Sequence, residues 1–218
     1  SVLKYVYFNN MSNCSSSNIE LSGSINFYKT DVLMENIYFT ENIKGDDYLN
    51  IINSKLFLKD LFFENSYADA LDIDYSSGKI HNIILKNSGD DAIDLSNSSI
   101  EIKNLKAEQI GDKGISVGEN SYLRGELFKI DNSFLGLAIK DQSEVDIKNL
   151  TIVNSEIPLA AYIKKEEYNS SKINISKFSA DNNLKNSIFE KDSSVIINGK
   201  IIKNFEKNVF KTLYPIDN

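Results

Sequence analysis

The sequence predicts an all-β fold, a single-stranded right-handed parallel β-helix of about eight coils with about 22 residues each. First, one pattern returns every 22 residues, in segments that begin at Ser66, Ser88, Ile110, Asn132 and Asn154. Second, each segment holds two apolar residues spaced two apart, which is the spacing of one face of a strand. Third, this period is shorter than the roughly 30 residues of a strand–helix–strand unit, but it suffices for one coil of a solenoid.

Residues 1–46 are expected to form irregular first coils. Val2 to Phe8 alternates apolar and polar residues, as a strand with one buried face does. Residues 11–24 are rich in Ser and Asn with weak periodicity, and residues 31–42 recover the apolar pattern. The chain opens in the middle of this strand with no cap before it, so we expect an upstream domain of the same polypeptide.

Residues 47–162 are expected to form the regular coils. Leu49 precedes Leu71 by 22 residues, and later apolar pairs repeat at the same spacing, giving each coil a second and a third strand. Asn65 and Asn87 have this spacing as well. We therefore expect these two residues to stack as an inward asparagine ladder that binds turn backbone groups.

The register breaks after Tyr162, and the rest of the chain is expected in three parts. Residues 163–172 are a polar loop insertion, and residues 173–200 form the last coils. Residues 201–218 contain apolar residues at helical spacing and are expected to cap the last coil, because an open solenoid end exposes its core. Residues 1–218 are treated as a single β-helix domain.

Composition limits the partners. The net charge of −7 disfavours nucleic acid, which needs basic patches, and no apolar run is long enough to predict a membrane span. An acidic polysaccharide or cell-surface glycan stays open as a partner, since a bound cation can bridge two carboxylates. Cys14 is the only cysteine, so it predicts no intrachain disulfide.

The outward face of the first strand of each coil gathers carboxylates. Because side chains alternate across a strand, residues next to the inward apolar pair point out and stack from coil to coil. One predicted column is Asn50, Asp72, Asp94, Ser116, Ala138 and Ala160. The acids brought together on neighbouring coils are Asp69, Asp72, Asp74, Asp90, Asp91 and Asp94.

Three interpretations of this acidic cluster stay open. The aspartates can accept hydrogen bonds from backbone N–H groups at the turns. They can bind Ca²⁺, which prefers several carboxylate oxygens, with Asp69, Asp72, Asp90, Asp91 and Asp94 as ligands. They can also act as an acid/base pair in glycoside hydrolysis, which needs two carboxyl groups about 5–9.5 Å apart.

The motifs GDDAIDLS at Gly89 and GDKGISVGE at Gly111, preceded by ADALDID, resemble the pectin-lyase-like β-helix superfamily. Similarity to polygalacturonases implies a catalytic set of Asp69, Asp90, Asp91 and Lys140, but Lys113 or Gly114 replaces the family's histidine and Ala138 its arginine. Similarity to calcium-dependent pectate lyases implies Asp69, Asp90, Asp91 and Asp94 as metal ligands, but Ser116 stands at the position of the lysine base.

Each enzyme class therefore lacks one required group, and Lys113 or Lys140 would have to substitute. The pattern also resembles β-helix repeat domains of larger exported bacterial proteins, which implies an extracellular or cell-surface location. We favour a non-catalytic carbohydrate-facing or structural module of a larger exported protein, and Ca²⁺ binding by its acidic cluster stays open. A polysaccharide lyase or glycoside hydrolase that acts on an acidic polysaccharide through the same cluster is the alternative. The substrate groove is expected to include Asp74, Ser116, Lys140 and Tyr162.

Overall fold

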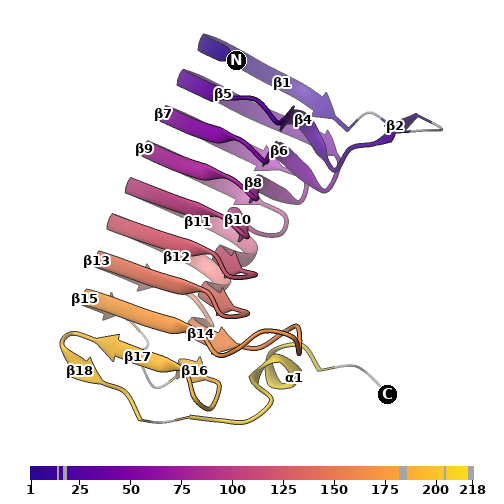
Figure 1. Cartoon of the computed structure of the whole chain (residues 1–218). Coiled ribbons are helices and arrows are strands. Elements are labelled where there is room, and N and C mark those ends of the chain that lie inside the picture. The colour runs from indigo at the N-terminus through magenta and orange to yellow at the C-terminus, as the bar shows by residue number, and fades with distance from the viewer. Residues whose placement is uncertain (14, 17–18, 182–185, 204, 216–218) are drawn as a thin grey trace.

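The structure, a computed structural model, is a column of stacked parallel β coils (Figure 1). It describes residues 1–13, 15–16, 19–181, 186–203 and 205–215, so Cys14 lies outside the described residues. The column has about eight turns of about 22 residues, which confirms the predicted parallel β-helix. Over the described residues, no helix has the length and apolar character needed to cross a membrane.

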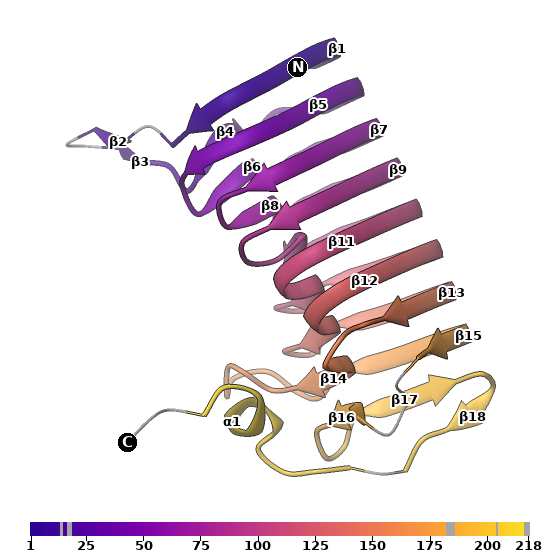
Figure 2. The same ribbon diagram turned by 180° about the vertical axis from the view of Figure 1, so that it is seen from behind.

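Long strands form one continuous side of the column, each hydrogen-bonded to the next (Figures 1 and 2). They are β1 (Val2–Ser12), β5 (Val32–Lys44), β7 (Lys55–Ser66), β9 (Ser77–Ser88), β11 (Ser99–Gly118), β12 (Tyr122–Lys140), β13 (Glu144–Val153), β15 (Lys172–Ala180) and β17 (Ser194–Ile197). The second and third strands expected in each coil are one long strand here. It bends where Asp60 and Asn82 have left-handed φ values of 54° and 59°.

Short strands form the other side, and this is the side that carries the acidic cluster. They are β4 (Gly23–Tyr28), β6 (Asp47–Ile52), β8 (Asp69–Asp74), β10 (Ile93–Ser96), the ends of β11 and β12, β14 (Ile157–Tyr162) and β16 (Ile188–Phe189). The predicted inward pairs of the 22-residue repeat, such as Leu71 with Ile73 and Leu137 with Ile139, are fully buried in one continuous core.

A buried serine ladder runs along the turn between each short strand and the next long strand. The Oγ of Ser76 accepts the Ser54 N–H at 2.9 Å, and the Oγ of Ser98 accepts the Ser76 N–H at 2.9 Å. Ser121 and Ser143 continue the series. Each hydroxyl thus accepts a hydrogen bond from a turn N–H that has no partner in the strand ladders. The serines therefore bind the turn backbone groups, which is the role that we expected of the asparagines.

The prediction of an inward asparagine ladder at Asn65 and Asn87 is wrong in one respect. The two side chains do stack, with Asn87 Nδ2 donating to Asn65 Oδ1 at 2.6 Å, but they do so at the surface of the column. Both residues have left-handed φ, 59° and 54°. Asn tolerates this conformation well, which accounts for its recurrence at the corner.

The remaining elements lie outside the regular coils. A small hairpin of β2 (Ser15–Ser16) and β3 (Ile19–Glu20) projects from the first coils (Figure 1). At the other end β17 turns back into the antiparallel β18 (Lys200–Ile201). The one described helix, α1 (Val209–Leu213), lies beside β14 on the flank of the short-strand side (Figures 1 and 2). Ile202 and Phe205, earlier in the segment expected to cap the last coil, pack against the main core.

Candidate functional site

Strand register confirms that equivalent residues of successive coils stack. Asp72 pairs with Asn50 before it and with Asp94 after it, and Asp94 pairs with Ser116. The full outward column is Asn26, Asn50, Asp72, Asp94, Ser116, Ala138, Ala160 and Ile188. Its character changes from polar and acidic to apolar along the column.

We call the outward face of β6, β8 and β10 with its adjoining turns the acidic half of the short-strand side. We call the outward surface of β12 and β14, formed by Leu135, Ala138, Ala160 and Tyr162, the apolar half. The two halves meet at the end of β11, where Lys113 and Ser116 lie.

The turn aspartates hold one coil to the next. Asp69 Oδ1 accepts the N–H of Asp91 at 2.7 Å, and Asp91 Oδ1 accepts the N–H of Lys113 at 2.9 Å. This is the backbone-capping role that aspartates have in turns. Backbone capping gives a role to one carboxylate oxygen of Asp69 and one of Asp91. It does not explain the other carboxylates of the acidic cluster.

Three carboxylates converge in the acidic half. Ligand oxygens of Asp69, Asp91 and Asp94 all lie within 4.8 Å of one another. Asp94 Oδ1 is buried and accepts no hydrogen bond, and Lys140 Nζ is 3.9 Å from it. A buried oxygen without a partner is costly, and a hard cation among the three carboxylates would satisfy it. The residues present therefore fit Ca²⁺.

A second acidic group already contains a cation of the protein. Oxygens of Asp90, Asp91 and Asp112 also lie within 4.8 Å of one another. The Lys113 ammonium bonds Asp91 at 3.1 Å and contacts Asp112, while the Tyr214 ring centre is 5.6 Å away. Lys113 thus compensates part of the charge of this group. Asp91 belongs to both groups, so a metal ion held by Asp69, Asp91 and Asp94 would share the Asp91 carboxylate with Lys113, whereas Asp69 and Asp94 form no ion pair with Lys113 in the described structure.

The five predicted metal ligands are therefore divided among different environments. Asp69, Asp91 and Asp94 come together, whereas Asp90 lies with Asp112 in the group whose charge Lys113 partly compensates. Asp72 joins neither group and accepts a hydrogen bond from Asn50 Nδ2 at 2.8 Å.

Burial and mutual repulsion change the titration of these acids. Burial, with the neighbouring charge of Asp91, raises the pKa of Asp69 to about 9. Burial and the charge of Asp47 raise the pKa of Asp72 to about 10, and burial and Asp94 raise that of Asp74 to about 6. Without a cation the acidic half therefore retains protons near neutral pH, and a divalent ion would displace them.

Neither predicted lysine is arranged as a base. Burial lowers the pKa of Lys113, but the carboxylates of Asp91 and Asp112 outweigh it, so the net shift is upward and Lys113 stays charged. Lys140 is buried, and its side chain lies over Gly118, where an added Cβ would be 2.9 Å from Lys140 Cε. Ser116, at the base position of the pectate lyase pattern, is fully buried and its Oγ has no partner.

Most of the predicted groove residues are covered in this conformation. Ser116, Lys140 and Tyr162 are 0%, 4% and 1% exposed, and only Asp74 is partly open to solvent. Tyr162 lies under α1, where its ring stacks on Phe210 with centroids 5.9 Å apart. The 22-residue repeat predicted the strand register of these residues on the short-strand side, but it could not show what packs against them.

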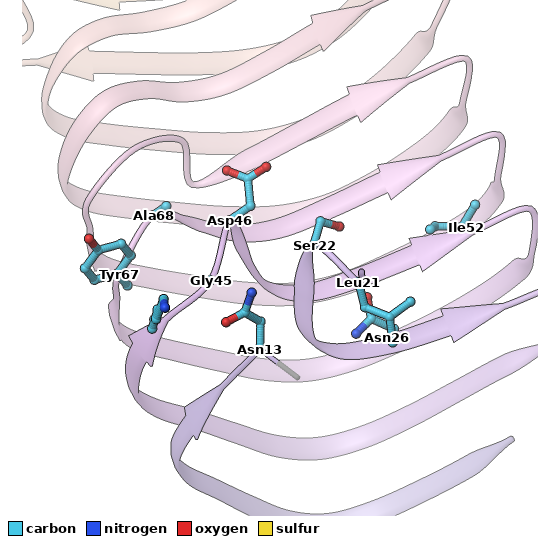
Figure 3. A pocket seen from close by; sticks show the side chains of 10 residues that line it. Asn13, Leu21, Ser22, Asn26, Gly45, Asp46, Ile52, Tyr67 and Ala68 are labelled. Carbon is cyan, nitrogen blue, oxygen red and sulfur yellow. The ribbon is translucent and has the colours of Figure 1, made fainter. Parts of the chain in front are cut away.

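An open hollow of about 720 Å³ adjoins the acidic half on the side of the first coils (Figure 3). Its lining includes Asn13, Asn26, Asp46 and the exposed ring of Tyr67. The wall is continuous with the acids, because Asn50 Nδ2 donates to Ser22 Oγ and to Asp72 Oδ2, both at 2.8 Å.

The buried residue Asn42 holds the hollow in shape. Its Nδ2 donates to Ser24 Oγ at 2.8 Å and to the Met11 carbonyl at 3.2 Å, and its Oδ1 accepts the Tyr67 N–H at 3.2 Å. The hollow is therefore preformed by hydrogen bonds between three different coils and has a volume in the range of small-ligand sites.

Two acids at the opposite turn anchor the inserted loop. Glu119 accepts the Ser96 hydroxyl at 2.5 Å and pairs with Lys165 Nζ at 2.8 Å. Asp141 Oδ1 accepts the N–H groups of Lys164 and Lys165 at 2.7 and 2.9 Å. Loop 163–172 is thus tied to the edge of the short-strand side.

Comparison of the chain with protein-family models, with curated proteins and with solved structures found no match. The fold and the geometry above are therefore the basis for the function that follows.

Proposed function

We propose that this protein is a non-catalytic, saccharide-facing β-helix module that binds Ca²⁺ in its acidic half. Asp69, Asp91 and Asp94 are the proposed ligands. The observation that supports this most is the convergence of their oxygens within 4.8 Å around Asp94 Oδ1, a buried oxygen with no hydrogen-bond partner.

The adjoining hollow supports an acidic saccharide as the partner. Ca²⁺ takes six to eight oxygen ligands, so three aspartates leave coordination positions for the carboxylate of a uronate. The hollow beside the acids presents side-chain amides and the exposed ring of Tyr67, whose face can stack on a sugar ring. The cation joins the negative protein surface to a negative polymer.

The charge state of the lysines supports a binding role over catalysis. A lyase needs a base with a pKa near the working pH, whereas the pKa of Lys113 is shifted upward by its carboxylate partners. The Ser116 hydroxyl has no hydrogen-bond partner in the described structure and is closed to solvent. We propose an exported location as well, because carboxylate sites of moderate affinity suit the millimolar Ca²⁺ outside cells.

Thermal unfolding with and without Ca²⁺ tests the metal site. At a concentration 100 times the Kd, a ligand stabilises the native state by about 2.7 kcal/mol, which corresponds to about 5–11 °C in Tm for a chain of this size. We expect such a rise with CaCl₂ at pH 8 and a smaller one with MgCl₂. An unchanged Tm in millimolar Ca²⁺ rules the site out.

Titration calorimetry with uronate oligosaccharides tests the partner. We expect binding that requires Ca²⁺ and is lost with EDTA, together with no formation of unsaturated or reducing ends. Neutral oligosaccharides of the same length are the control. Release of unsaturated or reducing ends that is lost in Asp91→Ala would show an enzyme and overturn the non-catalytic assignment.

A further inference from the structure

The apolar half of the short-strand side is covered by a segment of the same chain. Val209 and Leu213 of α1 are buried against Leu135, Ala138 and Ala160, and Phe210 stacks on Tyr162. Ala138 and Ala160 belong to the outward column that carries Asp72 and Asp94 on earlier coils. Without α1, one uninterrupted face would run from the hollow through the acids to Tyr162.

The covering helix has little stability of its own. It has five residues, whereas isolated helices shorter than about 12–15 residues are marginal in water. Asn208, at its N-cap, has a left-handed φ of 59°, and its side chain makes no cap hydrogen bond. The N–H groups of Asn208 and Val209 donate instead to the carboxylate of Glu190, at 2.9 and 3.0 Å. The helix therefore forms only while it is docked.

One polar contact closes the covered region at its boundary with the acidic half. The Tyr214 hydroxyl donates to the Asp112 carboxylate at 3.1 Å, although the two residues are 102 positions apart. The same carboxylate contacts Lys113, whose ammonium also bonds Asp91. This partly buried contact is a single hydrogen bond from a neutral hydroxyl to a carboxylate.

We propose that Asn208–Tyr214 is a releasable cover, an autoinhibitory contact that hides the apolar half of the groove and is latched by Tyr214 on Asp112. Its release exposes a flat apolar surface with the Tyr162 ring next to the carboxylates. A ligand that prefers this surface displaces the cover by mass action. That such a ligand is a sugar rests on the proposed function, whereas the opening of the cover does not.

Hydrogen exchange on the full chain tests whether the cover opens by itself. The amides of Lys211, Thr212 and Tyr214 donate within the helical turn, to the carbonyls of Asn208, Asn208 and Phe210. We expect them to exchange at least 100-fold faster than the amides of Leu137 and Leu159 in the core, and at a rate independent of low denaturant concentrations. Exchange of both sets in one cooperative step would overturn the proposal.

Labelling of Tyr162 tests the opening with variants. In Leu213→Asp the cover loses a buried apolar contact, and we expect nitration of Tyr162, followed by peptide mass spectrometry, to accelerate at least 10-fold while the melting of the coils stays unchanged. Lys211→Asp, at an exposed position of the same helix, is the control and should label like the wild type. Protection of Tyr162 in Leu213→Asp, or unfolding of the coils with the cover, would contradict a releasable element. Neither readout involves Ca²⁺ or a saccharide, so this proposal can fail while the proposed function stands, and the reverse.

Discussion

The acidic and apolar halves are built on equivalent strands of successive coils, in the same register, with a buried apolar pair beneath each strand. They differ in which side chains point outward, Asp72 and Asp94 in one half and Ala138 and Ala160 in the other. Small apolar side chains let a helix approach and bury Val209 and Leu213, whereas the carboxylates would lose water without gaining partners. The side chain at this one outward column position therefore separates the half that the chain covers with its own helix from the half where we propose that a cation binds.

The largest effect should come from the cations at the boundary between the halves. Lys113→Met removes the partner of Asp91 and Asp112, and breaking a partly buried pair of this kind costs about 3 kcal/mol. Lys140→Met is the control, because the Lys140 side chain is buried even more deeply than that of Lys113 but has its nearest carboxylate oxygen at 3.9 Å. We expect urea unfolding to show a loss about three times larger for Lys113→Met. Equal losses would mean that Lys113 does not compensate the charge of its acidic group.

The second-largest effect should be a pH dependence of the free energy of unfolding that comes from the acidic half. The raised pKa values of Asp69, Asp72 and Asp74 mean that the folded state holds protons which the unfolded state releases above the usual value of 3.8. The unfolded state then binds fewer protons, so stability falls as the pH rises from about 4 through 6 towards 9.

With partial screening by water, we expect a loss of about 2 kcal/mol between pH 5 and pH 8, or about 4–8 °C in Tm. CaCl₂ should abolish the part of this loss that comes from Asp69, the proposed ligand among the three acids, since the metal takes the place of its proton. A Tm that rises over this range in EDTA would contradict the raised pKa values.

A smaller effect distinguishes two aspartates of neighbouring columns on the acidic face. Asp94→Asn removes a proposed ligand, and Asp74→Asn removes a nearby charge outside the three-carboxylate group. Both substitutions should stabilise the Ca²⁺-free protein at pH 8 by about 0.5–1 kcal/mol, since each relieves repulsion between like charges. Calorimetry should show that only Asp94→Asn weakens Ca²⁺ binding, by at least 10-fold. The metal assignment is wrong if the two variants bind Ca²⁺ alike.

The smallest effect is expected at the latch of the apolar half. Tyr214→Phe keeps the ring packed on Phe210 and removes only the hydroxyl that donates to Asp112. We expect the opening equilibrium of the cover, measured by hydrogen exchange of Thr212, to rise about 5- to 10-fold with little change in Tm. No change in that exchange would show that Tyr214 does not latch the cover.

Periodicity made the fold and the acidic columns predictable. A strict 22-residue repeat fixes which residues stack, and strand alternation fixes which side they face, so the positions of Asp72 and Asp94 follow from counting. The serine ladder at Ser54, Ser76 and Ser98 has the same period but was missed, because a small polar residue in a turn gives no apolar signal.

Contacts that do not repeat could not be predicted in this way. The C-terminal tail contacts Asp112 and Tyr162, which are far from it in the sequence. The spacing of Phe210 and Tyr214 does not show which surface these two side chains cover. The burial of Ser116 and Lys140 was likewise unpredictable, since it depends on side chains of neighbouring coils that extend along the column. The inward placement predicted for Asn65 and Asn87 is wrong because both residues have a left-handed backbone, which turns their side chains to the surface. Residue spacing alone does not reveal a left-handed φ.

Carboxyl-carbon NMR of the aspartate-labelled protein during a Ca²⁺ titration tests the central claim most directly. We predict that the signals of Asp69, Asp91 and Asp94 shift together and saturate at a single site. The signals of Asp69 and Asp91, whose pKa values are raised by burial, should stop titrating between pH 5 and pH 9, while the signal of Asp74 keeps titrating. If all exposed and buried aspartates shift alike without saturating, or if none shifts, the acidic half holds no metal site.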